Sequence, residues 1–298
     1  MPEILKPETT PAAPSKLQVF FVRLRSTVFL WALIGSALIL HHEGLMIGMV
    51  AIFGLLTTIE YLRMDNDDVE GRLYRRLAWV VTFIYWGLVL WHTLTKHVAH
   101  AWWLDMALPV VALQGAFCLT LRRGLEDRTT LFRILNSVFA VVYTTFMFGF
   151  MARLLYFNGL PEGVNHMLLV IAVTKFTDMG AYVVGSLFGR HKMIPRISPA
   201  KTWEGFVGAF IFGYLAMFLV MHYGAEHLKP LTWGHAMLLV PFISLATVVG
   251  DLAESVLKRC HHIKDAGHKL PGIGGILDLT DSLLFTAPVT YFYLQAIA

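Results

Sequence analysis

The chain has 298 residues, of which 56% are hydrophobic and only 15% are charged, and its mean hydropathy is +0.61. This composition excludes an ordinary soluble domain and predicts an all-α, polytopic integral membrane protein. The net charge is +4, but in a membrane protein the placement of the charges is more informative than their sum. The sequence contains no nucleic-acid-binding motif, and we expect no nucleic-acid partner.

Residues 1–18 are polar and contain four prolines, and no apolar segment of the signal-peptide type follows directly. We therefore expect a disordered cytosolic tail and a first hydrophobic segment that stays in the membrane. Cys118 falls in a predicted span and Cys260 in a predicted cytosolic loop, so the two cysteines do not indicate a disulfide.

Apolar stretches of helical length recur along the rest of the chain, each near the roughly 20 residues that a membrane span needs. They are residues 26–41, 44–63, 78–95, 101–121, 134–156, 164–188, 205–223, 234–257 and 276–298. The pattern predicts a bundle of about nine transmembrane helices. The first stretch is short and only residues 41–43 separate it from the second, so a re-entrant hairpin is an open alternative for this pair.

The basic residues are distributed unequally between the predicted loops. All but four of the 24 lysines and arginines fall on one side of the nine predicted spans. The exceptions are Lys96, Arg153 and Lys229 on the other side and Lys175 within the sixth span. Because loops rich in Lys and Arg stay in the cytosol, this distribution predicts a cytosolic N-terminus. We expect a multi-pass protein of the bacterial inner (plasma) membrane.

The sixth predicted span carries an acid inside the membrane. Asp178 lies about ten residues, or about 15 Å, from the cytosolic end of this span, and an ionisable group at such a depth suggests a functional site. Small residues such as Gly180 and Gly185 allow close helix contact, so a packing seam in which Asp178 pairs with Lys175 is the alternative. Small-residue faces of this kind are also compatible with a homodimer.

The loop after this span is basic and contains Ser198-Pro199, which we expect to form a turn and cap leading into the next helix. A helix start at that point would offer free backbone N–H groups. With the side chains of Ser198, Lys201 and Thr202 these groups would form a phosphate cradle, although the spacing is not that of a P-loop.

Acidic and polar side chains recur at helical spacing in the last two predicted spans, and both series start from the same predicted face. They are Asp251, Glu254, Ser255 and Lys258 in the eighth span, and Asp278, Asp281, Ser282 and Phe285 in the ninth. Carboxylates gathered in a low-dielectric setting repel one another unless protons, bases or a cation compensate. Oxygen ligands of this type select Mg²⁺, which binds one or two carboxylates together with substrate phosphates.

A long motif runs from Ser255 through Lys258-Arg259 and Lys264-Asp265 to Gly274-Gly275, Asp278 and Asp281. An earlier stretch runs from Asp178 to Ser198-Pro199 and Lys201-Thr202-Trp203-Glu204-Gly205. Together they resemble the phosphatidate cytidylyltransferases, or CDP-diacylglycerol synthases. The resemblance covers residues 170–290, whereas the first half of the chain is similar only in being hydrophobic and multi-span.

The resemblance implies an enzyme that joins CTP to phosphatidate, or to a related lipid phosphate, and releases pyrophosphate to leave CDP-diacylglycerol in the bilayer. It also implies Mg²⁺, with or without a second cation, to offset phosphate charge during in-line displacement. Residues 19–160 would be N-terminal membrane helices, and residues 161–298 would be the catalytic membrane helices with their cytosolic loops.

The site residues that the resemblance implies fall into three groups. The metal ligands are Asp251 and Asp278, supported by Asp281 and Asp178; further catalytic residues are Lys258, Lys264 and Asp265; residues that hold nucleotide or phosphate are Ser198, Lys201, Thr202, Arg259, Gly274 and Gly275.

Two positions depart from the family pattern. Ile273 stands where the family usually has His, and Leu279 stands where it usually has Arg. These changes leave open a degenerate member of the family that acts as a lipid-binding or assembly protein. A second alternative is an ion- or proton-coupled transporter whose path is lined by the intramembrane acids. Such transporters often have repeated halves, which the sequence does not show.

Overall fold

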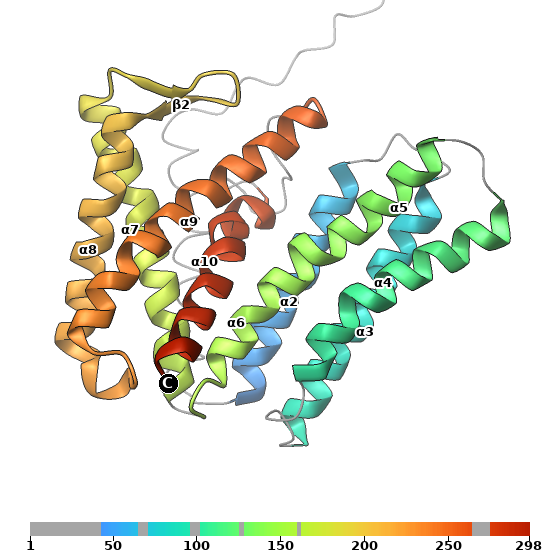
Figure 1. Ribbon diagram of the computed structural model, residues 1–298, viewed down its shortest axis with the longest axis horizontal. Coiled ribbons are helices and arrows are strands. Elements are labelled where there is room, and N and C mark those ends of the chain that lie inside the picture. The colour runs from blue at the N-terminus through green and yellow to red at the C-terminus, as the bar shows by residue number, and fades with distance from the viewer. Residues whose placement is uncertain (1–42, 65–70, 96–101, 125–127, 160–161, 264–274) are drawn as a thin grey trace, which may run out of the picture.

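The computed structural model describes residues 43–64, 71–95, 102–124, 128–159, 162–263 and 275–298. These residues form a bundle of long helices with a short two-stranded sheet at one end (Figure 1). The α-helices are α2 (Glu43–Met64), α3 (Arg72–Leu94), α4 (Trp102–Arg123), α5 (Arg128–Ala140), α6 (Met147–Leu155), α7 (Glu162–Phe188), α8 (Trp203–Gly224), α9 (Trp233–Cys260) and α10 (Ile276–Ile297). The π-helix η2 (Val141–Phe146) joins α5 to α6, the 3-10 helix η3 (Ala225–His227) follows α8, and the strands are β1 (Lys192–Ile194) and β2 (Ser198–Thr202).

Seven helical stretches within the described residues are long and apolar enough to cross a membrane. They correspond to the second through eighth predicted spans, with α5, η2 and α6 forming one continuous stretch, Arg128–Leu155. The prediction of an all-α membrane protein is confirmed at this level. Helix α10 has 22 residues and occupies the ninth predicted span, but it is not one of the seven. The first predicted span, residues 26–41, lies outside the described residues.

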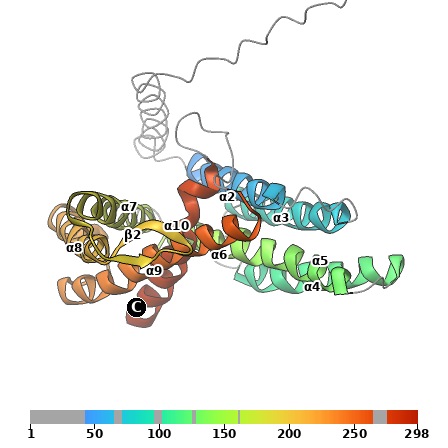
Figure 2. The ribbon, with the colours of Figure 1, turned by 90° about the horizontal axis from the view of Figure 1, so that it is seen from above.

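Helix α10 lies between two groups of helices (Figures 1 and 2). Helices α7, α8 and α9 form one group, and α2 to α6 form the other. Helix α10 packs against α9 and α7 on one side and against α6 and α2 on the other. Its buried apolar side chains, including Leu277, Leu284 and Ala287, belong to the main hydrophobic core. Because α10 carries two of the motif acids, its contacts decide where those acids lie.

Helices α7 and α8 pack with their backbones in close contact. A Cβ atom on Gly180 would lie 2.5 Å from both the carbonyl oxygen of Gly208 and Cβ of Phe212. A Cβ on Gly208 would in turn lie 2.5 Å from Cβ of Val184. The predicted close helix contact at Gly180 is therefore made inside the chain, and this seam positions the α7 residues beside the start of α8.

The short sheet is an antiparallel hairpin between α7 and α8, with Lys192 paired to Thr202 and Ile194 to Ser198. The prediction that a helix starts at Ser198-Pro199 is wrong, because both residues lie in β2 and α8 begins at Trp203. The cap is Thr202, whose hydroxyl accepts a hydrogen bond from the Gly205 N–H at 3.1 Å. Proline is tolerated in an edge strand because the ladder need not use its missing N–H.

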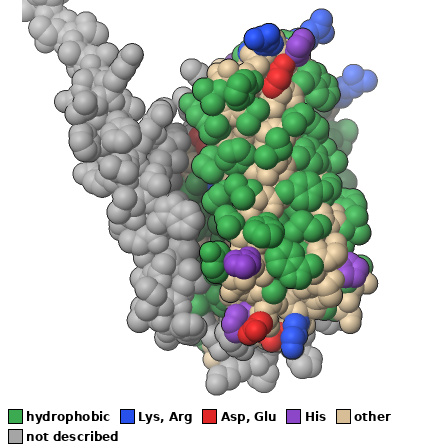
Figure 3. Space-filling model, turned by 90° about the vertical axis from the view of Figure 1, so that its left-hand side faces the viewer, with side chains coloured by type: hydrophobic (Ala, Val, Ile, Leu, Met, Phe, Trp, Pro, Cys, Tyr) green, Lys and Arg blue, Asp and Glu red, His purple; other side chains and the backbone are tan. Residues whose placement is uncertain are grey.

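The side of the molecule on which α8 lies is covered by hydrophobic side chains (Figure 3). Charged and histidine side chains gather toward its two ends, with a broad apolar band between them. On α8, the hydrophobic side chains of Val207, Ile211, Leu215 and Phe218 are all exposed. Such an arrangement matches a helix that faces lipid, since its backbone polar groups are satisfied within the helix.

Candidate functional site

A cavity of about 700 Å³ lies between α7, α8, α9, the hairpin and the first turns of α10. It brings together residues from both motif stretches that the sequence singled out. The charged and hydroxyl side chains in its wall include Asp178, Ser198, Lys201, Thr202, Asp251, Glu254, Asp278, Asp281 and Ser282. Because hairpin residues line it, the cavity lies at the end of the bundle that carries the hairpin, which we call the hairpin end.

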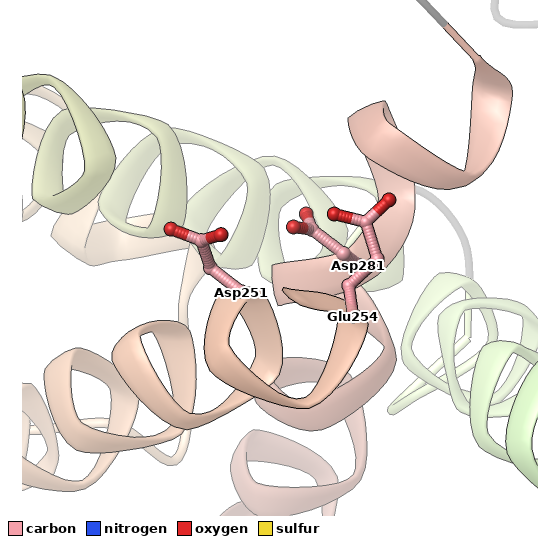
Figure 4. Close-up of side chains that lie close together, drawn as sticks. All are labelled: Asp251, Glu254 and Asp281. Atoms are coloured by element: carbon pink, nitrogen blue, oxygen red, sulfur yellow. The ribbon is translucent and has the colours of Figure 1, made fainter. Parts of the chain in front are cut away.

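Three carboxylates in this cavity form a compact group, which we call the acid group: Asp251, Glu254 and Asp281. One oxygen from each lies within 4.8 Å of the others. Asp251 and Glu254 come from one face of α9 and Asp281 comes from α10, and the three side chains project into the same space (Figure 4). Glu254 and Asp281 are only 3% and 5% exposed, so their mutual repulsion is poorly screened by water.

Lys201 on β2 compensates part of this charge. Its Nζ lies 2.8 Å from Oδ2 of Asp251 and donates to the carbonyl oxygen of Val248 at 3.2 Å. The hairpin is thereby joined to α9 at the position of the acid group. The side chain of Asp251 is 42% exposed, so this ion pair stays accessible to a ligand in the cavity.

Lys258 joins the two acidic helices. Its Nζ lies 3.0 Å from Oε2 of Glu254, one turn earlier on α9, and 2.5 Å from Oδ1 of Asp278 on α10. Asp278 also accepts the backbone N–H of Gly275 at 2.7 Å, so it closes the first turn of α10. These contacts explain why Asp278 lies beside the acid group without being a member of it.

Asp178 lines the cavity from α7. Its Oδ2 is 3.6 Å from Nζ of Lys175, the partner that the packing alternative names, and the Ser282 hydroxyl lies 3.4 Å from its Oδ1. Lys175 also donates to the carbonyl oxygen of Leu279 at 2.9 Å. This lysine therefore connects α7 to the first turns of α10.

The residues present fit a hard divalent cation. The acid group offers only oxygen donors, and Oε1 of Glu254 is buried without a hydrogen-bond partner in the described part of the chain. A buried unpaired carboxylate oxygen is costly unless a cation or donor reaches it. Glu254 was placed on the acidic stripe by its i+3 spacing from Asp251, but it was not expected among the ligands.

The other predicted site residues differ in whether they line the cavity. Ser198 and Lys201 line the cavity, while the Thr202 hydroxyl is occupied as the cap of α8. Arg259 lies at the exposed end of α9, where its Nε donates to the carbonyl oxygen of Ile197 at 3.4 Å and so contacts the hairpin. Gly275 is the N-cap residue of α10. Lys264, Asp265 and Gly274 lie outside the described residues.

A model of the cytidylyltransferase family matches residues 21–297, which is nearly the whole chain. The chain belongs to this family. The match extends through the N-terminal helices, which the motif residues alone did not connect to any family. The acid group and the paired lysines therefore lie in a member of the cytidylyltransferase family.

Curated relatives agree with this membership. The chain is 41% identical over 132 residues to the phosphatidate cytidylyltransferase of Bacillus subtilis, covering 44% of this chain and 48% of the relative. It is 41% identical over 160 residues to that of Mycobacterium tuberculosis H37Rv, covering 53% and 46%. It is also 30% identical over 217 residues to an uncharacterized protein, YnbB, of Escherichia coli K12, covering 72% and 70%. The chain spans about half the length of the named phosphatidate cytidylyltransferases.

Proposed function

We propose that this protein transfers the cytidylyl group of CTP to phosphatidate, giving CDP-diacylglycerol and pyrophosphate. The single observation that carries the proposal is the cavity at the hairpin end, in which the acid group faces Lys201 within reach of the lipid-facing helices α7 and α8. Acids that can hold a divalent cation and a lysine that can hold phosphate are what a nucleotidyl transfer between two phosphate groups requires. Named relatives with the same activity support it.

In this proposal a phosphate oxygen of phosphatidate attacks the α-phosphorus of CTP. The new phosphorus–oxygen bond forms as the bond to the bridging oxygen of the β-phosphate breaks, and pyrophosphate leaves with that electron pair. Asp251, Glu254 and Asp281 would hold Mg²⁺, with Asp278 and Asp178 beside them as supporting carboxylates. When bound, the cation supplies positive charge that offsets the charge of the phosphates.

Lys201 and Lys258 have the complementary role of orienting phosphate groups. Each is paired with a carboxylate of the cavity, so its ammonium is held in place before substrate binds. An ammonium is a compact point charge that tolerates several phosphate geometries. We assign nucleotide contact to Lys201, because it lies on the hairpin at the exposed side of the acid group.

Phosphatidate would approach from the bilayer. Tyr182 on α7 and Phe206 on α8 line the cavity, and Tyr182 is 76% exposed. Aromatic side chains at this position provide an apolar border between the lipid-facing surface and the polar wall. The glycerol backbone and acyl chains would stay on the α7–α8 side while the phosphate enters the cavity.

For topology we propose nine spans in the bacterial inner membrane, with the hairpin end and the N-terminus in the cytosol. Support comes from the charge distribution, in which the loops on the hairpin side carry most of the basic residues. CTP is a cytosolic nucleotide, so a cavity that opens at this end suits the proposed substrate. A homodimer stays a prediction.

The decisive experiment is an assay of purified protein with CTP, Mg²⁺ and phosphatidate, in which pyrophosphate and CDP-diacylglycerol are measured. We expect both products in equal amounts, and neither when phosphatidate is omitted. If the protein is instead a degenerate member of the family that acts in lipid binding or assembly, the wild type should form neither product. This alternative would be established by an inert wild type that gains turnover when Ile273→His is combined with Leu279→Arg.

A further inference from the structure

A buried acid from the first half of the chain contacts the helix that carries Asp281. Glu60 on α2 is only 1% exposed, and its Oε2 accepts a hydrogen bond from the backbone N–H of Leu277 at 2.9 Å. Leu277 is the second residue of α10. A carboxylate is almost never this deeply buried without a specific partner, and the Leu277 N–H at the start of α10 is such a partner.

The contact supplies an acceptor that the N-cap residue of α10 cannot offer, in addition to the Asp278 contact with the Gly275 N–H. The first N–H groups of a helix have no acceptor within the helix, and a side chain at the N-cap position usually supplies one. In α10 the N-cap residue is Gly275, which has no side chain to offer. Glu60 supplies an acceptor from a different helix, and its negative charge suits the positive end of the α10 dipole.

A second contact fixes α2 to the same turns of α10. The hydroxyl groups of Thr57 and Thr280 lie 3.0 Å apart, and both residues are fully or almost fully buried. Thr57 and Glu60 are one turn apart on α2, so together their contacts fix both the position of α10 along its axis and its rotation about that axis. Asp281, the α10 member of the acid group, follows Thr280 directly and lies about one turn beyond Leu277.

We propose that Glu60 is a positioning residue for the acid group: by accepting the Leu277 N–H it sets the depth and rotation of α10, and hence the place of Asp281 opposite Asp251 and Glu254. This inference rests on the proposed function in taking the acid group as a divalent-metal site. It assigns a role in that site to the N-terminal helices. Residues that orient metal ligands from outside typically change metal affinity by about 10- to 100-fold.

The test compares variants that separate the effect of side-chain length at residue 60 from the effect of its charge. Glu60→Gln keeps the length of the side chain and an acceptor oxygen but loses the charge. Glu60→Asp keeps the charge but is one methylene shorter, and Glu60→Ala removes the acceptor altogether. Mn²⁺ binding to each purified, folded variant is measured from the loss of the free Mn²⁺ signal in electron paramagnetic resonance, without any substrate.

We expect Glu60→Gln to bind Mn²⁺ with the wild-type dissociation constant, and Glu60→Asp and Glu60→Ala to bind it roughly tenfold more weakly. The control is Tyr74→Phe, which removes the buried 2.8 Å hydrogen bond to Thr120 between α3 and α4. It should lower thermal stability and leave the Mn²⁺ affinity unchanged, which separates positioning from general destabilisation.

Equal Mn²⁺ affinity in all folded Glu60 variants would overturn the proposal, and so would a Glu60→Gln variant as weak as Glu60→Ala. Turnover of CTP, measured in parallel, separates this inference from the proposed function. If Mn²⁺ binding depends on Glu60 as expected but the wild type forms no CDP-diacylglycerol, the proposed function fails and the positioning role stands. If the wild type is active and the variants match it in both measurements, the positioning role fails alone.

Discussion

Lys201 Nζ lies 2.8 Å from Oδ2 of Asp251, which joins the hairpin to α9. Lys201 belongs to the earlier motif stretch and Asp251 to the acidic series of the eighth predicted span, and their contact brings the two into one site. Lys201 compensates part of the charge of the three clustered carboxylates, as Lys258 does at Glu254, and the remaining negative charge is available to a cation. Phosphate oxygens entering the cavity would meet the same lysine.

The acid group gives the first prediction. Asp251→Asn and Asp281→Asn should each lower turnover by at least about a hundredfold, the scale of a lost electrostatic contact in a transition state. Because the amide is nearly isosteric and removes one of three repelling charges, unfolding without metal should not become easier. Turnover is measured by pyrophosphate release and stability by thermal unfolding in detergent.

The neighbouring carboxylate Asp278 has a separate expected outcome. It pairs with Lys258 and caps α10, so Asp278→Asn should lower turnover and also weaken the start of the helix. The control is Glu226→Gln, an exposed acid-to-amide change in η3, at the other end of α8 from the cavity, which should leave turnover unchanged.

The metal assignment would be contradicted by near-normal turnover in both Asp251→Asn and Asp281→Asn.

The second prediction concerns Lys201. Lys201→Met should raise the KM for CTP roughly tenfold or more, since a hydrogen bond to a charged group contributes about 1.5–3 kcal/mol. Lys201→Arg keeps a positive charge and should have a smaller effect. Steady-state kinetics with varied CTP provide the measurement. Arg196→Met, an exposed change on the same hairpin that does not line the cavity, should leave the KM at its wild-type value.

The third prediction concerns orientation in the membrane. The free cysteines Cys118 and Cys260 are both exposed and would first be replaced by Ala and Ser. In that background Arg196→Cys should react with an impermeant maleimide only after the inner membrane is permeabilised. Glu226→Cys, at the other end of α8, should react from outside. Labelling of the hairpin position in intact spheroplasts would reverse the proposed topology.

The fourth prediction concerns the contact between α7 and α8. Gly180→Ala would put a methyl group 2.5 Å from the Gly208 carbonyl oxygen and from Phe212, so the two helices must separate. Overpacking of this kind costs about 1–3 kcal/mol. We expect a lower thermal midpoint and lower turnover, because Asp178 is on the same helix. Among the residues that the structure describes, a Cβ on Gly48 of α2 would meet nothing within 4 Å, so Gly48→Ala should leave both unchanged.

Local sequence patterns predicted much of the architecture. Runs of apolar residues near the length of a bilayer identified the helices, because a backbone in lipid must satisfy its own hydrogen bonds. The i, i+3 spacing of Asp251 and Glu254 fixed their common face, because side chains at that spacing are neighbours on a helix. The prediction at Ser198-Pro199 was wrong because a Ser-Pro pair does not by itself distinguish a helix cap from an edge strand.

The sequence by itself therefore determined the class of protein, the helical stripes and the motif residues that resemble the family. Only the tertiary structure decided which acids meet. Glu254 joins Asp251 and Asp281 because α9 and α10 pack side by side, whereas Asp278 is directed to Lys258 and to its own helix start. The same packing brings Glu60 to Leu277 across 217 residues of sequence. Contacts between distant helices depend on how side chains fill the space between them, and no local period encodes that.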